Sequence, residues 1–153
     1  MEDALRILVV ESRFYDAISD ALLEGATDAL KAFGAEFDVV TVPGAFELPA
    51  AISYAEEAGH SASGLRYDGF VALGCVIRGE TTHYDYVCGE SARGLMNLSV
   101  EKRLAIGYGV LTVEDEAQAW ARARVSEGDK GGGAARACLD VLSLRKRLLG
   151  QAR

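Results

Sequence analysis

Short apolar runs and stretches of helical spacing alternate along this chain. Residues 7–10 and 70–73 are apolar without interruption, which is typical of strands buried on both faces of a sheet. Segments 37–42 and 105–111 predict two further strands, although two glycines weaken the second of them. The pattern therefore predicts four strands.

Between these runs, apolar residues recur every three or four positions, as on one face of an amphipathic helix. The segment 15–33 shows this spacing clearly, and Gly34 supplies its C-cap. A second helix is predicted over 46–58, with Pro49 in its first turns. The remaining predicted helices cover 85–103, 114–125 and a C-terminal stretch that follows the glycines at 131–133.

Strands that alternate with helices at this spacing predict right-handed crossovers and a parallel sheet covered on both faces. The predicted fold class is α/β, a three-layer αβα sandwich of flavodoxin-like type with a four-stranded parallel sheet flanked by helices. No linker, repeat or low-complexity tract divides the chain, so residues 1–153 are expected to form a single domain. Ligands of such sheets bind outside the carboxyl ends of the strands, where the site is therefore expected.

Composition limits the partners. The chain has 153 residues, of which 16 are basic and 23 acidic, and the net charge is −7. This acidic balance disfavours a nucleic-acid partner, because a phosphodiester backbone repels it. No apolar run approaches the roughly 18 residues of a membrane span, and Met1-Glu2-Asp3 lacks the basic start of a signal peptide. We expect a cytoplasmic protein without a membrane partner.

The cysteines and the acidic clusters do not predict a metal site. Cys75, Cys88 and Cys138 are odd in number and widely spaced, so neither a disulfide framework nor a zinc-finger spacing fits. Buried free thiols are the expected state. The three carboxylates at 114–116 stand at a predicted helix start, where acids usually complement the helix dipole in solvent.

Polar clusters gather in the loops that follow the predicted strands, at 11–14, 43–47, 74–86 and 112–114. The third loop combines a glycine, two hydroxyls and a helix start, and its free backbone N–H groups can bind a phosphate or another oxyanion. His83 in the same loop titrates near neutral pH and suits proton transfer, although a structural histidine is also compatible with this position.

Three aromatic residues near these loops, Phe14, Phe46 and Tyr108, suit stacking on a flat heteroaromatic ring. Core packing is the alternative for each. The segment 129–133 again combines a cation, Lys130, with exposed N–H groups, and its alternative is a flexible hinge.

Four segments, taken in order, resemble the lumazine synthase family over essentially the entire chain. They read VPGAFELP at 42–49, GCVIRGETTHYD at 74–85, GVLTVE at 109–114 and DKG at 129–131. The resemblance implies a transferase that condenses 5-amino-6-(D-ribitylamino)uracil with 3,4-dihydroxy-2-butanone 4-phosphate. The products are 6,7-dimethyl-8-ribityllumazine, phosphate and water, in the penultimate step of riboflavin biosynthesis. No metal or organic cofactor takes part.

The resemblance also implies roles for single residues. His83 matches the proton-transfer residue, and Phe14 matches the residue that stacks on the pyrimidine. The residues that match the pyrimidine subsite are Phe14, Ala45, Phe46, Glu47, Cys75, Val76, Ile77 and Tyr108. Those that match the butanone phosphate subsite are Glu80, Thr81, Arg122 and Lys130. Of these, Tyr108, Arg122 and Lys130 match positions that a neighbouring subunit contributes.

The resemblance implies self-association and a functional link to riboflavin synthase. The segment 122–130 lacks the glycine- and lysine-containing stretch of family members that build sixty-subunit shells, so a homopentamer or a dimer of pentamers is expected. Two positions depart from the family pattern. Cys75 stands where a small or hydroxylated residue is common, and Tyr108 stands where phenylalanine is frequent.

Two other functions fit the same predicted scaffold. A protein that holds a flavin or lumazine without turnover needs no phosphate site, which Arg122, Lys130 and His83 argue against. A flavodoxin-like electron carrier needs a hydroxyl-rich phosphate loop after the first strand, and residues 11–14 offer a single serine.

Overall fold

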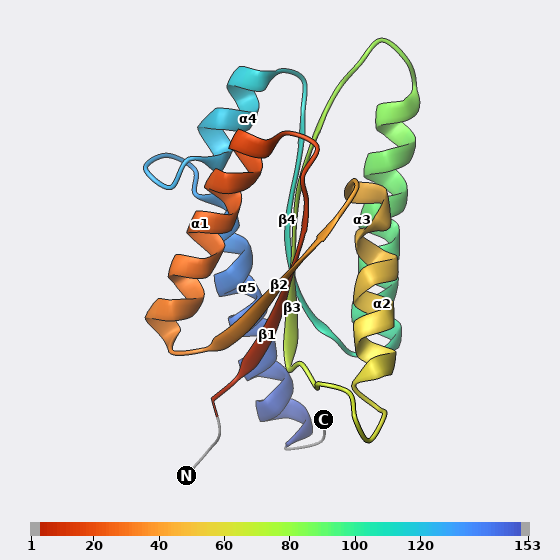
Figure 1. Cartoon of the computed structure of the whole chain (residues 1–153), viewed down its shortest axis with the longest axis vertical. Coiled ribbons are helices and arrows are strands. Elements are labelled where there is room, and N and C mark those ends of the chain that lie inside the picture. The colour runs from red at the N-terminus through yellow and green to blue at the C-terminus, as the bar shows by residue number, and fades with distance from the viewer. Residues whose placement is uncertain (1–3, 151–153) are drawn as a thin grey trace.

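A computed structural model describes residues 4–150, and Met1-Glu2-Asp3, on which the signal-peptide argument rests, lies outside this range. Strands and helices alternate throughout the described chain (Figure 1). The elements are β1 (Arg6–Ser12), α1 (Asp16–Phe33), β2 (Glu36–Val42), the 3-10 turn η1 (Ala45–Glu47), α2 (Leu48–Ala58), β3 (Gly69–Ile77), α3 (His83–Glu101), β4 (Ala105–Val113), α4 (Glu116–Ala123) and α5 (Lys130–Leu149).

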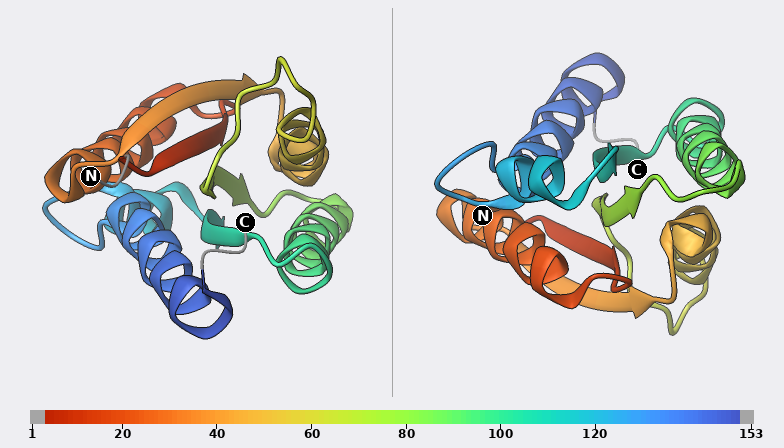
Figure 2. Two further views of the ribbon diagram at one scale, coloured as in Figure 1. Left: turned by 90° about the horizontal axis from the view of Figure 1, so that it is seen from below. Right: turned by 90° about the horizontal axis from the view of Figure 1, so that it is seen from above.

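The strands form one parallel sheet in the order β2-β1-β3-β4. Helices α1, α4 and α5 cover one face, and α2 and α3 cover the other (Figures 1 and 2). This arrangement confirms the predicted three-layer αβα sandwich. The chain moves outward from β1 to β2 and then returns past β1 to β3, so the direction of winding reverses between β1 and β3. Such a switch point opens a crevice at the carboxyl ends of the two strands.

The uninterrupted apolar run of β1 serves two cores. Ile7 and Val9 belong to the cluster beneath α1 and α5, whereas Leu8 and Val10 belong to the cluster beneath α2. All four are at most 3% exposed. Because successive strand residues point to opposite faces, a strand covered on both sides needs apolar residues at every position.

The inner strand β3 and the edge strand β4 are both longer than predicted. β3 continues from the predicted 70–73 through Ile77, so Cys75, Val76 and Ile77 lie on a strand and not in a loop. β4 is intact despite its glycines. A Cβ at Gly107 would lie 2.0 Å from the Ala134 carbonyl oxygen of α5, so this glycine permits close packing of helix on strand and does not break the strand.

The hinge interpretation of residues 129–133 is wrong, because Asp129 is the N-cap of α5 and the helix begins at Lys130 and includes all three glycines. The Asp129 carboxylate caps the helix by accepting a hydrogen bond from the Gly132 N–H at 3.2 Å. A Cβ at Gly131 would lie 2.0 Å from the Leu22 carbonyl oxygen of α1. Gly131 therefore permits the close contact between α1 and α5.

Other helix boundaries shift by a few residues. α3 begins at His83, two residues before the predicted start, and ends at Glu101. α4 is shorter than predicted because Asp115 is its N-cap and accepts a hydrogen bond from the Gln118 N–H at 2.9 Å. The predicted helix over 46–58 divides into η1 and α2, with Pro49 in the first turn of α2.

All three cysteines are free thiols, and Cys75 and Cys138 are buried as expected. Cys88 is only partly buried, so burial is wrong for that residue. Within residues 4–150, no group of three histidine, cysteine or acidic side chains is arranged to hold a metal ion. No helix in the same range is long and apolar enough to cross a membrane.

Candidate active site

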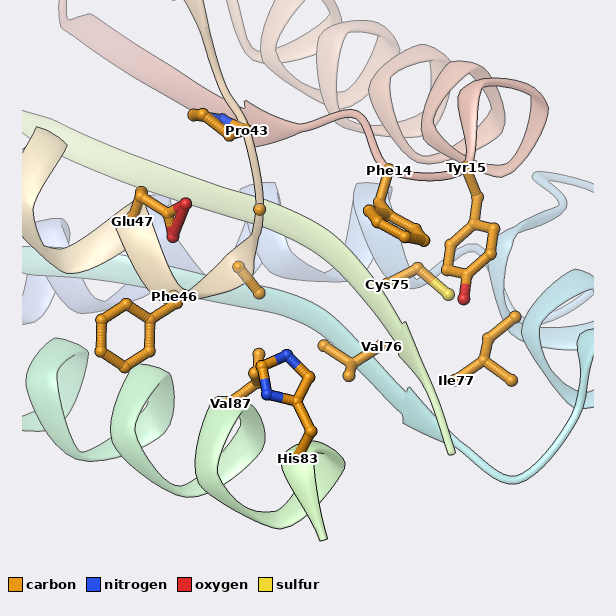
Figure 3. A pocket seen from close by; sticks show the side chains of 12 residues that line it. Phe14, Tyr15, Pro43, Phe46, Glu47, Cys75, Val76, Ile77, His83 and Val87 are labelled. Atoms are coloured by element: carbon orange, nitrogen blue, oxygen red, sulfur yellow. The ribbon is translucent and has the colours of Figure 1, made fainter. Parts of the chain in front are cut away.

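A pocket of about 530 Å³ opens at the carboxyl edge of the sheet, where β1 and β3 part. Four segments line it: the loop after β1, the connection through η1, the end of β3 and the start of α3 (Figure 3). Its lining residues are Phe14, Tyr15, Pro43, Gly44, Ala45, Phe46, Glu47, Cys75, Val76, Ile77, His83 and Val87. The pocket thus brings together His83 and every residue of the predicted pyrimidine subsite except Tyr108.

Exposed aromatic rings flank this pocket. Phe14 is 73% exposed and Phe46 is 58% exposed, so the core-packing alternative is wrong for both. Tyr15 contacts Phe14 edge to face, with ring centroids 4.9 Å apart and an angle of 71° between the planes. Exposed rings at a pocket wall are available to stack on a flat ligand.

The turn η1 presents polar and apolar groups to the same cavity. Ala45 of this turn is buried, and Phe46 and Glu47 lie on one side of the pocket, across from Phe14 and Tyr15 (Figure 3). Because the 3-10 turn places three successive residues within one tight coil, a short motif supplies both an aromatic wall and a carboxylate.

The last residues of β3 form the remaining wall. Cys75 is 6% exposed, and burial raises the pKa of its thiol to about 11. The thiol is therefore protonated at neutral pH and acts as an apolar surface, since the thiolate is the nucleophilic form. Val76 and Ile77 continue this wall towards α3.

His83 is the first residue of α3, and its imidazole ring points into the pocket near Val76 and Val87 (Figure 3). Its backbone N–H donates to the Thr81 hydroxyl at 3.3 Å, which orders the preceding turn. The side chain itself is exposed. A histidine held in this way can exchange protons with a bound ligand.

Two lining residues carry no clear signal in the sequence. Tyr15 follows Phe14 at the start of α1, and burial raises the pKa of its phenol. Val87 lies one helical turn after His83 and therefore shares its face of α3. Only adjacency to stronger candidates could have indicated either of them.

The remaining candidates lie outside the pocket of the same chain. Glu80 and Thr81 are exposed in the turn before α3. Arg122 in the last turn of α4 and Lys130 at the start of α5 are exposed, and both helices lie on the opposite face of the sheet from α3. The Gly128 N–H donates to the Ala121 carbonyl at 2.9 Å, which folds the loop between the two helices back towards α4.

Tyr108 also lies outside the pocket, on the edge strand β4. Its side chain is 47% exposed, so core packing is wrong here too. Partial burial raises the pKa of the Tyr108 phenol, and electrostatic interactions with Cys88 and Tyr84 of α3 act in the same direction. A single chain does not bring Tyr108, Arg122 or Lys130 to its own pocket.

The fold and the pocket define a flavodoxin-like α/β protein with a candidate small-molecule site at the carboxyl edge of its parallel sheet. Residues 4–146 match the family profile described as 6,7-dimethyl-8-ribityllumazine synthase. The chain belongs to this family.

Named relatives support the match. A 6,7-dimethyl-8-ribityllumazine synthase 1 from Rhizobium meliloti (strain 1021) is 60% identical over 144 residues, which cover 94% of each chain. A 6,7-dimethyl-8-ribityllumazine synthase from Agrobacterium fabrum is 59% identical over 144 residues, covering 94% of this chain and 97% of the relative. Among solved structures, a diflavin flavoprotein A3 from Nostoc sp. aligns over 97% of this chain and 99% of its own, with 17% identity and a TM-score of 0.36. So distant a likeness carries no information on function.

Proposed function

We propose that this chain condenses 5-amino-6-(D-ribitylamino)uracil with 3,4-dihydroxy-2-butanone 4-phosphate. The products are 6,7-dimethyl-8-ribityllumazine, one phosphate and two molecules of water, in the penultimate step of riboflavin biosynthesis. The observation that carries this proposal is the single pocket into which the segments at 43–47 and 75–77 converge with His83, in a chain of this family.

The pyrimidine binds in the pocket between the aromatic walls. Phe14 stacks on its ring, while the η1 residues Ala45, Phe46 and Glu47 hold the ribityl chain and the ring edges. Cys75, Val76 and Ile77 line the pyrimidine edge. The exposure of Phe14 and Phe46 at the wall of a cavity that Glu47 and His83 also line supports these roles, because both rings are free to cover a ligand.

His83 transfers protons through the reaction. An amine nitrogen of the pyrimidine attacks the butanone carbonyl, and the carbinolamine loses water. Phosphate is then eliminated, and the ring closes with loss of a second water. The imidazole, which points into the pocket, can accept and return protons at these steps. The orientation of two bound substrates supplies much of the remaining rate.

We propose that each complete site needs two chains. Glu80 and Thr81 take the phosphate at the mouth of one pocket, and Arg122, Lys130 and Tyr108 reach it from a neighbouring subunit. The position of both cations on the far face of the sheet supports this division. Arginine and lysine stabilise a departing phosphate through charge-assisted hydrogen bonds.

The assembly that follows is a homopentamer or a dimer of pentamers. Sedimentation of the native protein measures this directly, and a mass of sixty subunits would contradict it. We also propose a cytoplasmic location and a functional link to riboflavin synthase, which consumes the product.

The decisive experiment incubates the purified protein with both substrates. Release of inorganic phosphate and the appearance of a fluorescent lumazine are expected together, and omission of either substrate serves as the control. A protein that binds the pyrimidine or a flavin tightly but releases no phosphate with fresh substrates would instead be a binding protein. A tightly bound, coloured flavin in the purified protein would favour an electron carrier.

A further inference from the structure

Arg78 joins three chain segments at the edge of the proposed site. Its Nε donates to the Glu114 carboxylate, just after β4, at 2.9 Å. Its Nη1 lies 3.6 Å from the Asp85 carboxylate in the first turn of α3. Its guanidinium carbon lies 4.3 Å from the centre of the Tyr84 ring, and its backbone N–H donates to the Val113 carbonyl at 2.9 Å.

These contacts enclose the turn that leads to His83. Residues 79–82 are exposed, and a Cβ at Gly79 would meet nothing within 4 Å. Within the turn, the Thr81 hydroxyl accepts the His83 N–H, and the Thr82 carbonyl accepts the Asp85 N–H at 3.0 Å. The conformation of this exposed turn therefore depends largely on the contacts at its two ends. Arg78 makes contacts at both ends, with Val113 and Glu114 at one and with Tyr84 and Asp85 at the other.

The energetics also point to a geometric role. The side chains of Arg78, Glu114 and Asp85 are 41%, 58% and 60% exposed, and ion pairs at such sites contribute little to global stability. A guanidinium can bond one carboxylate while it stacks on a ring, which an ammonium group cannot reproduce. We therefore expect the chain to fold without this arginine but to lose the fixed start of α3.

We propose that Arg78 is a positioning residue that fixes His83 and the turn 79–82 relative to the pocket. This proposal rests on the proposed function, since His83 and the turn are placed there in proton transfer and phosphate binding. Arg78 acts through them and does not itself hold the phosphate, because Glu114 and Asp85 already engage its guanidinium. Misplacement of a reacting group by about 1 Å can cost on the order of 100-fold in rate.

Three variants and one control test this role. Arg78→Ala and Arg78→Lys remove the guanidinium that bonds Glu114 and contacts the Tyr84 ring. Glu114→Gln weakens the ion pair with Arg78 while Arg78 itself stays in place. Arg93→Ala is the matched control, because it removes an exposed arginine that pairs with Glu90 at 2.6 Å on the same helix. For each protein we would measure kcat, the KM of both substrates and the affinity for the pyrimidine alone.

We expect kcat to fall by about 10- to 100-fold in Arg78→Ala, with little recovery in Arg78→Lys and a smaller fall in Glu114→Gln. Pyrimidine affinity should be unchanged in all three variants, and Arg93→Ala should match the wild type. If Arg78 bound the phosphate directly, lysine would restore much of the activity and Glu114→Gln would keep full turnover. Either of those results would overturn the positioning role.

A second readout is independent of activity. Backbone hydrogen exchange across residues 79–84 should be faster in Arg78→Ala than in the wild type and unchanged in Arg93→Ala. This measurement separates the two proposals, because an inactive wild-type protein would refute the function alone. Unchanged exchange in Arg78→Ala would refute the positioning role even in an active enzyme.

Discussion

Phe14 lies in a turn that is stabilised by the buried carboxylate of Glu11. Glu11 at the end of β1 is 4% exposed, and its Oε2 accepts hydrogen bonds from Arg13 Nε at 3.0 Å and from the Thr41 hydroxyl at 2.9 Å. Arg13 also pairs with Asp16 at 3.1 Å and with Asp20. Arg13, the residue before Phe14, thus connects this turn to both β1 and α1.

Arg13→Ala should destabilise the protein by about 3 kcal/mol, because a buried carboxylate loses its cation. Glu11→Gln in the Arg13→Ala background should recover part of this loss, since an amide is less costly to bury than an unpaired charge. Chemical denaturation of the single and double variants measures both effects. Additive losses would show that the two side chains do not interact.

His83→Ala should lower turnover by about 100-fold or more, because the pocket loses its proton-transfer group. Pyrimidine affinity should change far less, since the aromatic walls remain. Steady-state kinetics and a binding titration measure the two quantities separately. His60→Ala is the matched control, because His60 pairs with Glu56 outside the pocket and its loss should leave turnover intact. Unchanged turnover in His83→Ala would remove this residue from the mechanism.

At the scale of elements, the close packing of α5 on α1 requires that position 131 carry no side chain. Gly131→Ala should destabilise the protein by roughly 2 kcal/mol or more, because its Cβ would lie 2.0 Å from a backbone oxygen that cannot rotate away. Gly133→Ala in the same helix meets nothing within 4 Å and should be neutral or stabilising by about 0.5 kcal/mol. Thermal unfolding of both variants checks this contrast. Equal effects at the two positions would contradict the packing argument.

The same glycines show what periodicity can and cannot predict. Apolar spacing is enough to predict four strands, the order of strands and helices and the layers, because burial on both faces requires apolar residues at every strand position. Apolar spacing does not distinguish a glycine that ends a helix or strand from a glycine that permits a neighbouring element to pack closely. Gly107 and Gly131 are of the second kind, and only the distance to α5 or α1 shows it.

The length of β3 could not be predicted for a related reason. Cys75 to Ile77 pair with β4 in the sheet, so hydrogen bonds to a distant strand, and not local pattern, extend β3 beyond its apolar run. Most residues of the candidate pocket could nevertheless be predicted from the sequence, because ligands of parallel sheets bind beyond the carboxyl ends of the strands. Arg78 could not be predicted in this way, since its importance lies in its contacts to Glu114, Asp85 and Tyr84.

At the scale of the whole molecule, the proposed site has an unusual consequence for mixtures of variants. His83 lies at the pocket of one chain, whereas Arg122 lies on the far face of the sheet and would complete the site of a neighbour. In an assembly, a His83→Ala chain still supplies Arg122, and an Arg122→Ala chain still supplies His83. Two inactive proteins should therefore complement each other.

Co-expression of the two variants in equal amounts should restore activity to about a quarter of the sites, since half of the pockets carry His83 and half of their neighbours carry Arg122. Each variant alone should remain nearly inactive. The measurement is phosphate release per chain, with the wild type assembled in the same way as the reference. If both residues served one site within a single chain, no mixture would contain an intact site, and co-expression would restore nothing.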